Sequence, residues 1–394
     1  MRIAVVTHQY PPDTDWGGVA TYYETLVPYL AMNGHEVTVI TWGRPARSYV
    51  ERGVKVRRIP PKRPFPGLSM ALGVFSLHHV LYQWAVDSVL TELRPDIVLT
   101  PESMADCGVY LARPRRRRAP VIVQLMSGVR MLSTLNAVPP KQFGGWSMLL
   151  LEQWVVLRAD CLSTLSQAKA EWARDNLRLA SRPIEVIANP VDILHFRPNL
   201  THADDHLVLY VGRLQWGKGC HILAQAINRI LRQMPETRFR FVGKDTQTAP
   251  GERSMKRYLE EILRAGGALG SVSFADHCPR ADLPAEYGAA AVCVVPSFWE
   301  TFGNVCLEAM ACGKAVVASR AGGLAEAIED NTSGLLVPPG DPESLATQII
   351  GLLRNPAERD RLGRAARARA EERYRPDRIA RQMVALMQRT IDRH

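Results

Sequence analysis

The sequence predicts an α/β protein of two domains, each built on a parallel sheet with helices on both faces. The chain has 394 residues and 46% hydrophobic residues, which is too long for one ordinary core and suits two domains of ordinary size. Short apolar runs alternate with helical patterns in both halves, as expected when each strand crosses over to a parallel neighbour through a helix. Between residues 189 and 206 a polar, proline-containing stretch interrupts this alternation and indicates the link between the domains.

Each expected strand is a short run rich in Val, Ile and Leu. In the first half we expect strands at residues 3–7, 36–41, 54–59, 96–100, 121–125, 161–164 and 184–188, with helices such as 19–32 and 144–158 between them. In the second half we expect strands at residues 207–211, 238–242, 272–274, 292–295, 315–318 and 334–337, and three closing helices at 342–353, 356–372 and 376–392. Two such domains create a cleft between the carboxyl ends of their sheets, where open α/β proteins bind ligands.

The net charge of +10 suits nucleic acid, anionic lipid or phosphorylated small molecules as partners. Arginines gather at residues 113–118 and in the last forty residues. We interpret the C-terminal set as the solvated faces of helices. No helix-turn-helix, zinc-finger or RNA-binding pattern is present in the sequence, so nucleic-acid binding is not expected.

The cysteine pattern and the hydropathy favour a cytoplasmic protein. Seven cysteines occur without a Cys-x-x-Cys pair, which predicts reduced, buried thiols rather than disulfides or zinc ligands. No apolar run reaches the ~18 residues that would span a bilayer. The first residues are expected to form a strand rather than a signal peptide.

The most informative segment lies between two expected strands of the second half. A loop with Glu300 and Gly303 is followed by a helix that begins near Asn304 and carries Glu308 in its first turns. A strand, a polar loop and a helix N-terminus form a phosphate site in open α/β sheets. A carboxylate such as Glu308 can accept two hydrogen bonds from a sugar diol. The alternative is a helix start with acidic residues favoured by the helix dipole.

Two other loops of interest follow the first strand of each half of the chain. Gly17 and Gly18 open a helix after the first strand of the chain, and Arg213 and Lys218 flank a glycine loop after the first strand of the second half. Glycine lets phosphate oxygens approach the backbone, while arginine and lysine can neutralise a diphosphate. Ordinary turns with surface basic residues are the alternative.

The segment Asp13-Thr-Asp15 is similar to a metal-binding Asp-x-Asp pattern. Two carboxylates do not by themselves fix an octahedral ion. We therefore expect no metal ion and no resident cofactor.

Together these segments resemble the retaining glycosyltransferases of family four, the glycosyltransferase group 1 family, which has two facing Rossmann-like domains (the GT-B fold). The resemblance rests on the following segments: Gly17-Gly18, Asn189-Pro-Val-Asp192, Val211-Gly-Arg213-Leu…Gly217-Lys218-Gly219, Glu300 with Glu308, and Gly322-Gly323-Leu-Ala-Glu326…Gly334-Leu-Leu-Val-Pro-Pro-Gly340-Asp341. It implies an acceptor-binding domain at residues 1–190 and a nucleotide-sugar-binding domain at 191–375. A last helix, 376–394, would pack back on the first domain.

The resemblance also implies residue roles. Arg213 and Lys218 would hold the donor diphosphate, and Glu308 would bind the ribose. Glu300 and the backbone at Phe302, Gly303 and Asn304 would hold the donor sugar and its phosphate, and Gly18 would close on the phosphate. The base would lie near Asp276-His277-Cys278. The implied reaction transfers a sugar from a nucleotide diphosphate sugar, UDP favoured and GDP possible, to a hydroxyl of a glycan, lipid-linked or small-molecule acceptor.

The chain departs from the family pattern after the strand at residues 121–125. Many relatives carry a histidine there, whereas this chain has Met126-Ser127-Gly128, so that histidine's role is not carried over. A sugar-nucleotide epimerase and a non-catalytic nucleotide-sugar-binding protein stay open as alternatives.

Whether the first domain contacts a membrane is also left open by the sequence. The apolar stretch 64–90 with Arg115–Arg118 could contact an anionic membrane and a lipid-linked acceptor. A core helix beside a solvated charge run is the favoured interpretation.

Overall fold

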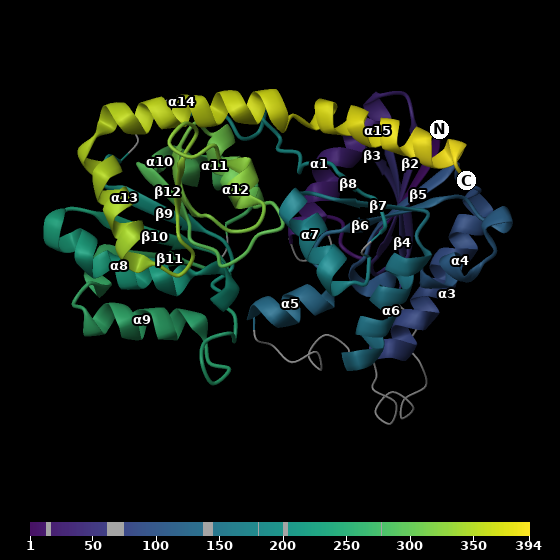
Figure 1. Ribbon diagram of the computed structural model, residues 1–394, viewed down its shortest axis with the longest axis horizontal. Coiled ribbons are helices and arrows are strands. Elements are labelled where there is room, and N and C mark those ends of the chain that lie inside the picture. The colour runs from purple at the N-terminus through teal and green to yellow at the C-terminus, as the bar shows by residue number, and fades with distance from the viewer. Residues whose placement is uncertain (13–16, 61–74, 137–144, 180, 200–203, 277) are drawn as a thin grey trace. The chain divides into compact units, whose positions relative to one another are not determined.

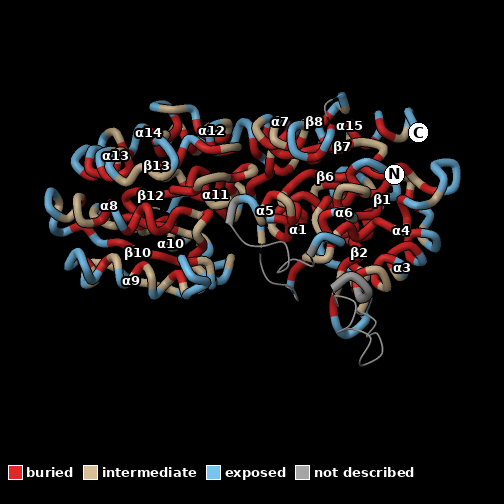
Figure 2. Tube along the Cα trace, turned by 60° about the horizontal axis from the view of Figure 1, so that its bottom comes forward, coloured by how far each residue is buried: buried red, intermediate tan, exposed pale blue. Residues whose placement is uncertain are grey.

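The computed structural model describes residues 1–12, 17–60, 75–136, 145–179, 181–199, 204–276 and 278–394. Its contacts divide the chain into two compact units, one of Met1–Pro190 with Pro376–His394 and the other of Val191–Arg375. Each unit has its own sheet with helices on both faces (Figure 1). Buried residues run along the strands of both sheets, and exposed residues lie on the outer helix faces and turns (Figure 2). The α/β class expected for each half is therefore confirmed.

The first unit contains an eight-stranded sheet in the order β3-β4-β2-β1-β5-β6-β7-β8. The strands are β1 (Arg2–Val6), β2 (Glu36–Trp42), β3 (Arg47–Glu51), β4 (Val54–Ile59), β5 (Ile97–Pro101), β6 (Val121–Leu125), β7 (Cys161–Thr164) and β8 (Ile184–Val186). All seven expected strands form, within one or two residues at most ends. Strands β1, β2, β5, β6 and β7 are buried along nearly their whole length, as a covered parallel sheet requires, whereas β4 and β8 have exposed positions.

Strand β3 was not expected, and it corrects the prediction of a wholly parallel sheet. It pairs antiparallel with β4 through a tight turn at Arg52-Gly53. Both turn residues have positive φ, 49° and 78°, which is the geometry of a two-residue hairpin loop. Four of the five residues of β3 are exposed, so this edge strand lacks the apolar run by which the others were found.

The helices of the first unit are α1 (Gly18–Met32), α3 (Phe75–Leu93), α4 (Gly108–Ala112), α5 (Val129–Asn136), α6 (Gly145–Arg158), α7 (Gln167–Asn176) and α15 (Pro376–Asp392). Helix α15 packs against α1. Its buried positions Ile379, Met383, Leu386 and Met387 recur at helical spacing and form one apolar face.

The apolar stretch 64–90 is described only from residue 75 onward, because 64–74 lie outside the described residues. In α3, Tyr82, Val86 and Leu90 are buried in the core of the unit, which confirms the core-helix interpretation for this part. Within the described ranges, no helix combines the length and the hydropathy needed to span a membrane.

The second unit contains a six-stranded parallel sheet in the order β11-β10-β9-β12-β13-β14. The strands are β9 (Leu207–Val211), β10 (Arg238–Val242), β11 (Val272–Ala275), β12 (Val292–Val295), β13 (Ala315–Ser319) and β14 (Leu335–Val337). The helices are α8 (Cys220–Gln233), α9 (Met255–Ala265), α10 (Leu283–Ala289), α11 (Asn304–Ala311), α12 (Leu324–Ala327), α13 (Pro342–Arg354) and α14 (Pro356–Arg373). All six strands expected here are confirmed.

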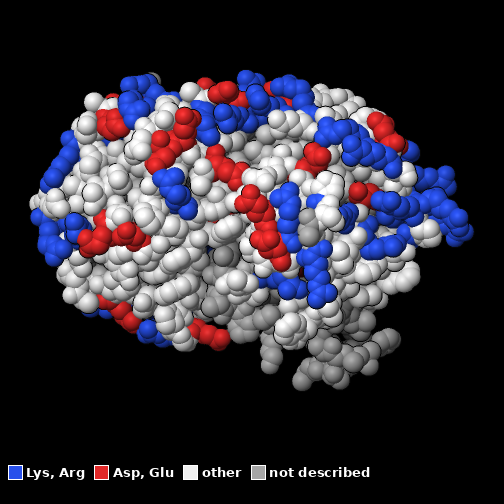
Figure 3. Space-filling model, viewed as in Figure 1, with Lys and Arg blue, Asp and Glu red and all other residues white. Residues whose placement is uncertain are grey.

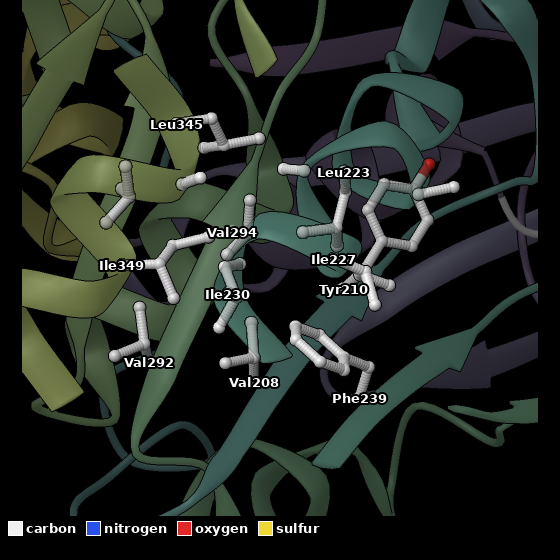
Figure 4. Packing of buried hydrophobic residues seen from close by; sticks show 14 of the residues in the cluster. Val208, Tyr210, Leu223, Ile227, Ile230, Phe239, Val292, Val294, Leu345 and Ile349 are labelled. Carbon is white, nitrogen blue, oxygen red and sulfur yellow. The ribbon is translucent and has the colours of Figure 1, made fainter. Parts of the chain in front are cut away.

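The core of this unit lies between the sheet and two helices. Side chains of β9 and β12, such as Val208 and Val294, point toward Ile227 of α8 and Ile349 of α13 (Figure 4). The residues are fully or almost fully buried, so the packing fixes the sheet whose loops carry the expected site.

The interpretation of the C-terminal arginines as a solvated face was wrong for part of α14. The guanidinium of Arg367 donates hydrogen bonds to the carbonyls of Phe196 and Ala311 at 2.8 and 2.7 Å. Arg359 and Arg369 likewise donate to backbone carbonyls of the second unit. These arginines anchor α14, because their donors satisfy carbonyls that water would otherwise have to reach.

Candidate active site

The sheet of the second unit has a switch point between β9 and β12. The chain leaves β9 toward β10 on one side, and β12 lies on the other side. At such a point the loops that follow the two strands diverge and leave room for a ligand. The loops in question carry Arg213 and Lys218 after β9, and Glu300 and Gly303 after β12.

These two loops are held in close contact by their backbones. The N–H of Phe298 donates to the carbonyl of Gly217 at 3.0 Å. Gly219 has φ +65°, and a Cβ there would lie 1.9 Å from the Pro296 carbonyl oxygen. Only glycine combines this backbone conformation with so close an approach.

Lys218 and Glu300, which the sequence placed 82 positions apart, form an ion pair. The Lys218 ammonium lies 2.6 Å from a carboxylate oxygen of Glu300, and their side chains are 30% and 10% exposed. The Ser297 hydroxyl donates to the same oxygen at 2.8 Å. Glu300 therefore fixes the position of the Lys218 ammonium group in the loop after β9.

Arg213 presents its charge differently. Its side chain is exposed, and within the described ranges no ion pair or hydrogen bond holds its guanidinium. The Tyr210 hydroxyl instead donates to the Arg213 carbonyl at 2.8 Å, so the backbone is fixed while the charged group stays accessible. An accessible guanidinium and a placed ammonium on the same loop can bind a diphosphate.

Helix α11 begins in this same loop. Gly303 precedes it with φ +93°, Phe302 is buried against the ring of Tyr374, and Asn304 is the first helical residue. The Gly323 N–H donates to the Glu300 carbonyl at 2.8 Å. A Cβ on Gly323 would lie 2.3 Å from the Thr301 carbonyl. The Gly322-Gly323 turn thus sets the path of residues 300–303, and the positive end of α11 adds to the site.

Glu308 lies on α11 and is buried. Its carboxylate accepts a hydrogen bond of 2.9 Å from the Tyr287 hydroxyl. Burial raises the pKa of Glu308 to about 7, against the opposing effect of the Arg280 guanidinium. A carboxyl group that ionises near neutral pH can accept hydrogen bonds from a diol above that pH.

The expected base-binding segment is only partly described. Asp276 is paired with Lys256 at 3.1 Å, His277 lies outside the described residues, and Cys278 is half-buried in the turn before α10. Burial, together with Glu286 and Asp282, raises the pKa of the Cys278 thiol, so it is a neutral group.

In the first unit, Gly17 and Gly18 lie after β1, and the switch point of that sheet is between β1 and β5. Gly17 is extended and precedes α1, where a Cβ would lie 3.1 Å from the Gln9 side-chain oxygen. A Cβ there would need only the flexible Gln9 side chain to shift, so neither packing nor backbone angles make glycine necessary at this position. Asp13 and Asp15 lie outside the described residues, and the described part of the chain holds no cluster of three metal-ligating side chains.

Sequence reasoning missed two carboxylates that hold the loop where many relatives have a histidine. Glu102, just after β5, accepts from the N–H groups of Met126 and Gly128 at 2.7 and 2.9 Å. Glu152 of α6 accepts from the Val129 N–H at 2.8 Å. Two side chains distant in sequence therefore fix the backbone of residues 126–129.

A buried lysine completes this cluster. The Lys169 ammonium, 1% exposed, lies 3.7 Å from the Glu102 carboxylate. Burial and the neighbouring Glu102 charge raise the pKa of Glu152 to about 8, and burial lowers the pKa of Lys169. Glu102 was recognisable as an acidic residue after a strand, but Glu152 and Lys169 read as ordinary helix residues.

The fold is that of the GT-B class, in which two Rossmann-like domains form one chain. Sucrose-phosphate synthase from Thermosynechococcus elongatus superimposes with a TM-score of 0.81 over 100% of both chains, at 24% identity. Anabaena HepE in complex with UDP and glucose gives a TM-score of 0.73 at 20% identity, over 98% of this chain and 99% of that one.

The family follows from the sequence matches. Residues 17–190 match the glycosyl transferase 4-like domain, and residues 192–369 match the glycosyl transferases group 1. A D-inositol 3-phosphate glycosyltransferase of Streptosporangium roseum is 34% identical, over 94% of this chain and 89% of that protein. The chain belongs to the group 1 glycosyltransferases.

Proposed function

We propose that this glycosyltransferase retains the anomeric configuration of the transferred sugar and prefers a UDP-sugar, with a GDP-sugar as the second choice. The charge arrangement at the switch point of the second unit supports a diphosphate leaving group, and retention and the UDP preference are what the family resemblance implies. The Lys218 ammonium is fixed by Glu300, the Arg213 guanidinium is exposed, and α11 begins at Asn304 beside them.

The chemistry follows from where negative charge develops. In the transfer, the bond between the sugar's anomeric carbon and the phosphate oxygen breaks, and the acceptor oxygen bonds to the same carbon. Charge builds on the leaving diphosphate, so cations placed beforehand stabilise the transition state more than the substrate. If the leaving phosphate oxygen accepts the acceptor's proton on the same face, no protein base is needed, which suits a chain with Met126-Ser127-Gly128 where relatives have a histidine.

The other donor contacts are assigned to the second unit as well. Glu308 would accept hydrogen bonds from the ribose, and the backbone of Phe302, Gly303 and Asn304 would bind the sugar and its phosphate. Cys278 lies in the loop after β11, on the carboxyl edge of the same sheet, and would face the base.

The proposal gives charge neutralisation to side chains and a helix terminus rather than to a metal ion. Turnover that persists in excess chelator is the expected result, and turnover that requires added Mg²⁺ or Mn²⁺ would contradict it.

The acceptor is proposed to be a hydroxyl of a glycan, of a lipid-linked acceptor or of a small molecule. The name of the Streptosporangium relative, a D-inositol 3-phosphate glycosyltransferase, supports testing a phosphorylated polyol first. All seven cysteines are free, and we propose a reducing, cytoplasmic setting.

A donor and acceptor screen tests the proposal. Thermal shift against UDP-, GDP- and ADP-sugars selects the donor, and mass analysis and NMR of the products give the linkage and the anomer. An inverted anomer would refute retention. Conversion of the nucleotide sugar itself without any acceptor would favour an epimerase, and tight donor binding with no product would favour a binding protein.

A further inference from the structure

A cavity lies in the first unit, away from the loops of the candidate active site. It has a volume of about 290 Å³, close to the lower end of small-molecule sites. Its charged lining is contributed by four arginines and two carboxylates: Arg115, Arg182, Arg389, Arg393, Asp160 and Glu185.

The cavity lies at the amino-terminal edge of the sheet. Asp160 immediately precedes β7, and Arg182 lies two residues before β8. The loops after β1, β5 and β6, which carry Gly17, Glu102 and Met126, leave the opposite edge of the same sheet. A ligand in this cavity would therefore not occupy the carboxyl edge, where the donor and acceptor loops lie.

Counted over the Arg, Asp and Glu side chains alone, the lining has an excess of two positive charges. Asp160 is already committed, because one of its oxygens accepts from the Arg115 side chain at 2.7 Å and the other from the Val121 N–H at 2.8 Å. It is also paired with the buried side chain of Arg118, which adds a further cation behind the lining.

Arg389 of α15 and Arg393, just after that helix, remain able to bind a ligand. Arg389 is 47% exposed and lies 3.2 Å from Glu185, an exposed pair of the kind that contributes little. Arg393 is exposed, and no ion pair or hydrogen bond holds its side chain to any residue that the structure describes.

The surroundings are basic too. Arg116 and Arg117 are exposed beside Arg115. Lys and Arg side chains gather at the end of the face where α15 ends and α4 leads toward β6 (Figure 3). Such a field attracts anions toward the cavity.

We propose that this cavity binds a phosphate monoester group. Guanidinium groups match the oxygens of phosphate through paired N–H donors. A phosphate monoester carries a charge of about −1.5 to −2 at neutral pH, which balances the excess of the lining. The group can come from a soluble phosphorylated metabolite or from a lipid headgroup such as that of phosphatidic acid, and the test separates the two.

The test measures binding of radiolabelled inorganic phosphate to the full chain by equilibrium dialysis at low ionic strength. All measurements use a background with Arg213→Ala and Lys218→Ala, which removes the cations expected to bind donor phosphate. Failure of the proposed function therefore does not affect the result. In this background we compare Arg389→Gln with Arg393→Gln as a double variant, and Arg381→Gln as the control. Arg381 is an exposed arginine of the same helix, paired with Asp377.

We expect the double variant to weaken phosphate binding by about tenfold or more, from the strength of hydrogen bonds to charged groups. The control should leave binding unchanged. A second arm measures co-sedimentation with vesicles of phosphatidylcholine, with and without phosphatidic acid.

Binding of free phosphate that depends on Arg389 and Arg393 would support a soluble ligand. Binding only to phosphatidic acid vesicles, with the same dependence, would support a lipid ligand. Absence of both, or an equal loss in the Arg381→Gln control, would overturn the proposal.

Discussion

The pairing of Lys218 with Glu300 gives a quantitative test of how the site works. Lys218→Met removes the cation expected to stabilise the leaving diphosphate, and kcat should fall by about 10²–10³, as when one charge-stabilising donor is lost. Glu300→Gln keeps the shape but weakens the 2.6 Å ion pair. A charge-assisted hydrogen bond is worth about 1.5–3 kcal/mol, and solvent screening of a partly exposed lysine lowers this to about 1–2 kcal/mol.

That energy is what Glu300 contributes to holding the ammonium in place. Glu300→Gln alone should therefore cost about 5- to 30-fold in kcat. If Glu300 acts through Lys218, the double variant should be no slower than Lys218→Met, with a coupling energy of about 1–2 kcal/mol. If the two losses multiply, Glu300 acts on the donor sugar independently, as the family resemblance implies.

The assay is steady-state release of nucleoside diphosphate, with kcat and KM reported separately and folding checked by circular dichroism. Lys55→Met is the matched control, because Lys55 forms an ion pair of the same 2.6 Å length with Glu36 in the first unit. Its kcat should equal that of the unaltered enzyme. A Lys218→Met enzyme with unchanged kcat would refute the assignment of Lys218 to the leaving group.

Three further predictions concern single residues. Because the pKa of Glu308 is raised to about 7, donor KM should rise as pH falls through 7, and in Glu308→Gln it should be about tenfold higher and insensitive to pH, as a kinetic pH profile would show. Gly219→Ala should destabilise the protein by at least about 2 kcal/mol, because its Cβ would meet the Pro296 carbonyl. Gly251→Ala, also at positive φ but with open space around it, should cost less in the same thermal melts, and equal costs would contradict the steric argument. The pKa of Glu152 is raised from 4.5 to about 8, so the stability it contributes is present below pH 4.5 and is lost as pH rises through 8. The free energy of unfolding falls by at most about 1.4 kcal/mol per pH unit because of this group. Glu152→Gln should therefore flatten the curve of melting temperature against pH over this range.

Most strands were predictable because they carry a short apolar run that is buried in the core. Strand β3 escaped prediction because its exposed residues carry no such run, and its pairing depends on the hairpin turn at Arg52-Gly53. The arginines of α14 were misread for a related reason. Charged residues along a helix are normally expected to face solvent. The sequence does not show that Arg367 hydrogen-bonds to backbone carbonyls, because those carbonyls belong to Phe196 and Ala311, far away along the chain.

The residues of the candidate site also fall into those that the sequence predicts and those that only the structure reveals. Lys218, Glu300 and Glu308 were singled out because loops after strands and helix starts are recognisable along the chain. Their partners were not, since Tyr287 and Ser297 have no sequence feature that sets them apart. Glu152 and Lys169 are clearer cases, because a carboxylate and an ammonium within helices are usually solvated, and burial among Glu102 and the loop of residues 126–129 changes their chemistry.

The sequence by itself therefore determined the α/β class, the order of the strands along the chain and the loops at which chemistry is expected, because hydrophobic periodicity and turn residues are local properties. Only the tertiary structure decided which charges meet, which are buried and which remain accessible. Coulomb energies and desolvation depend on distances and exposure between residues such as Lys218 and Glu300, which are 82 positions apart in the chain and 2.6 Å apart in the fold.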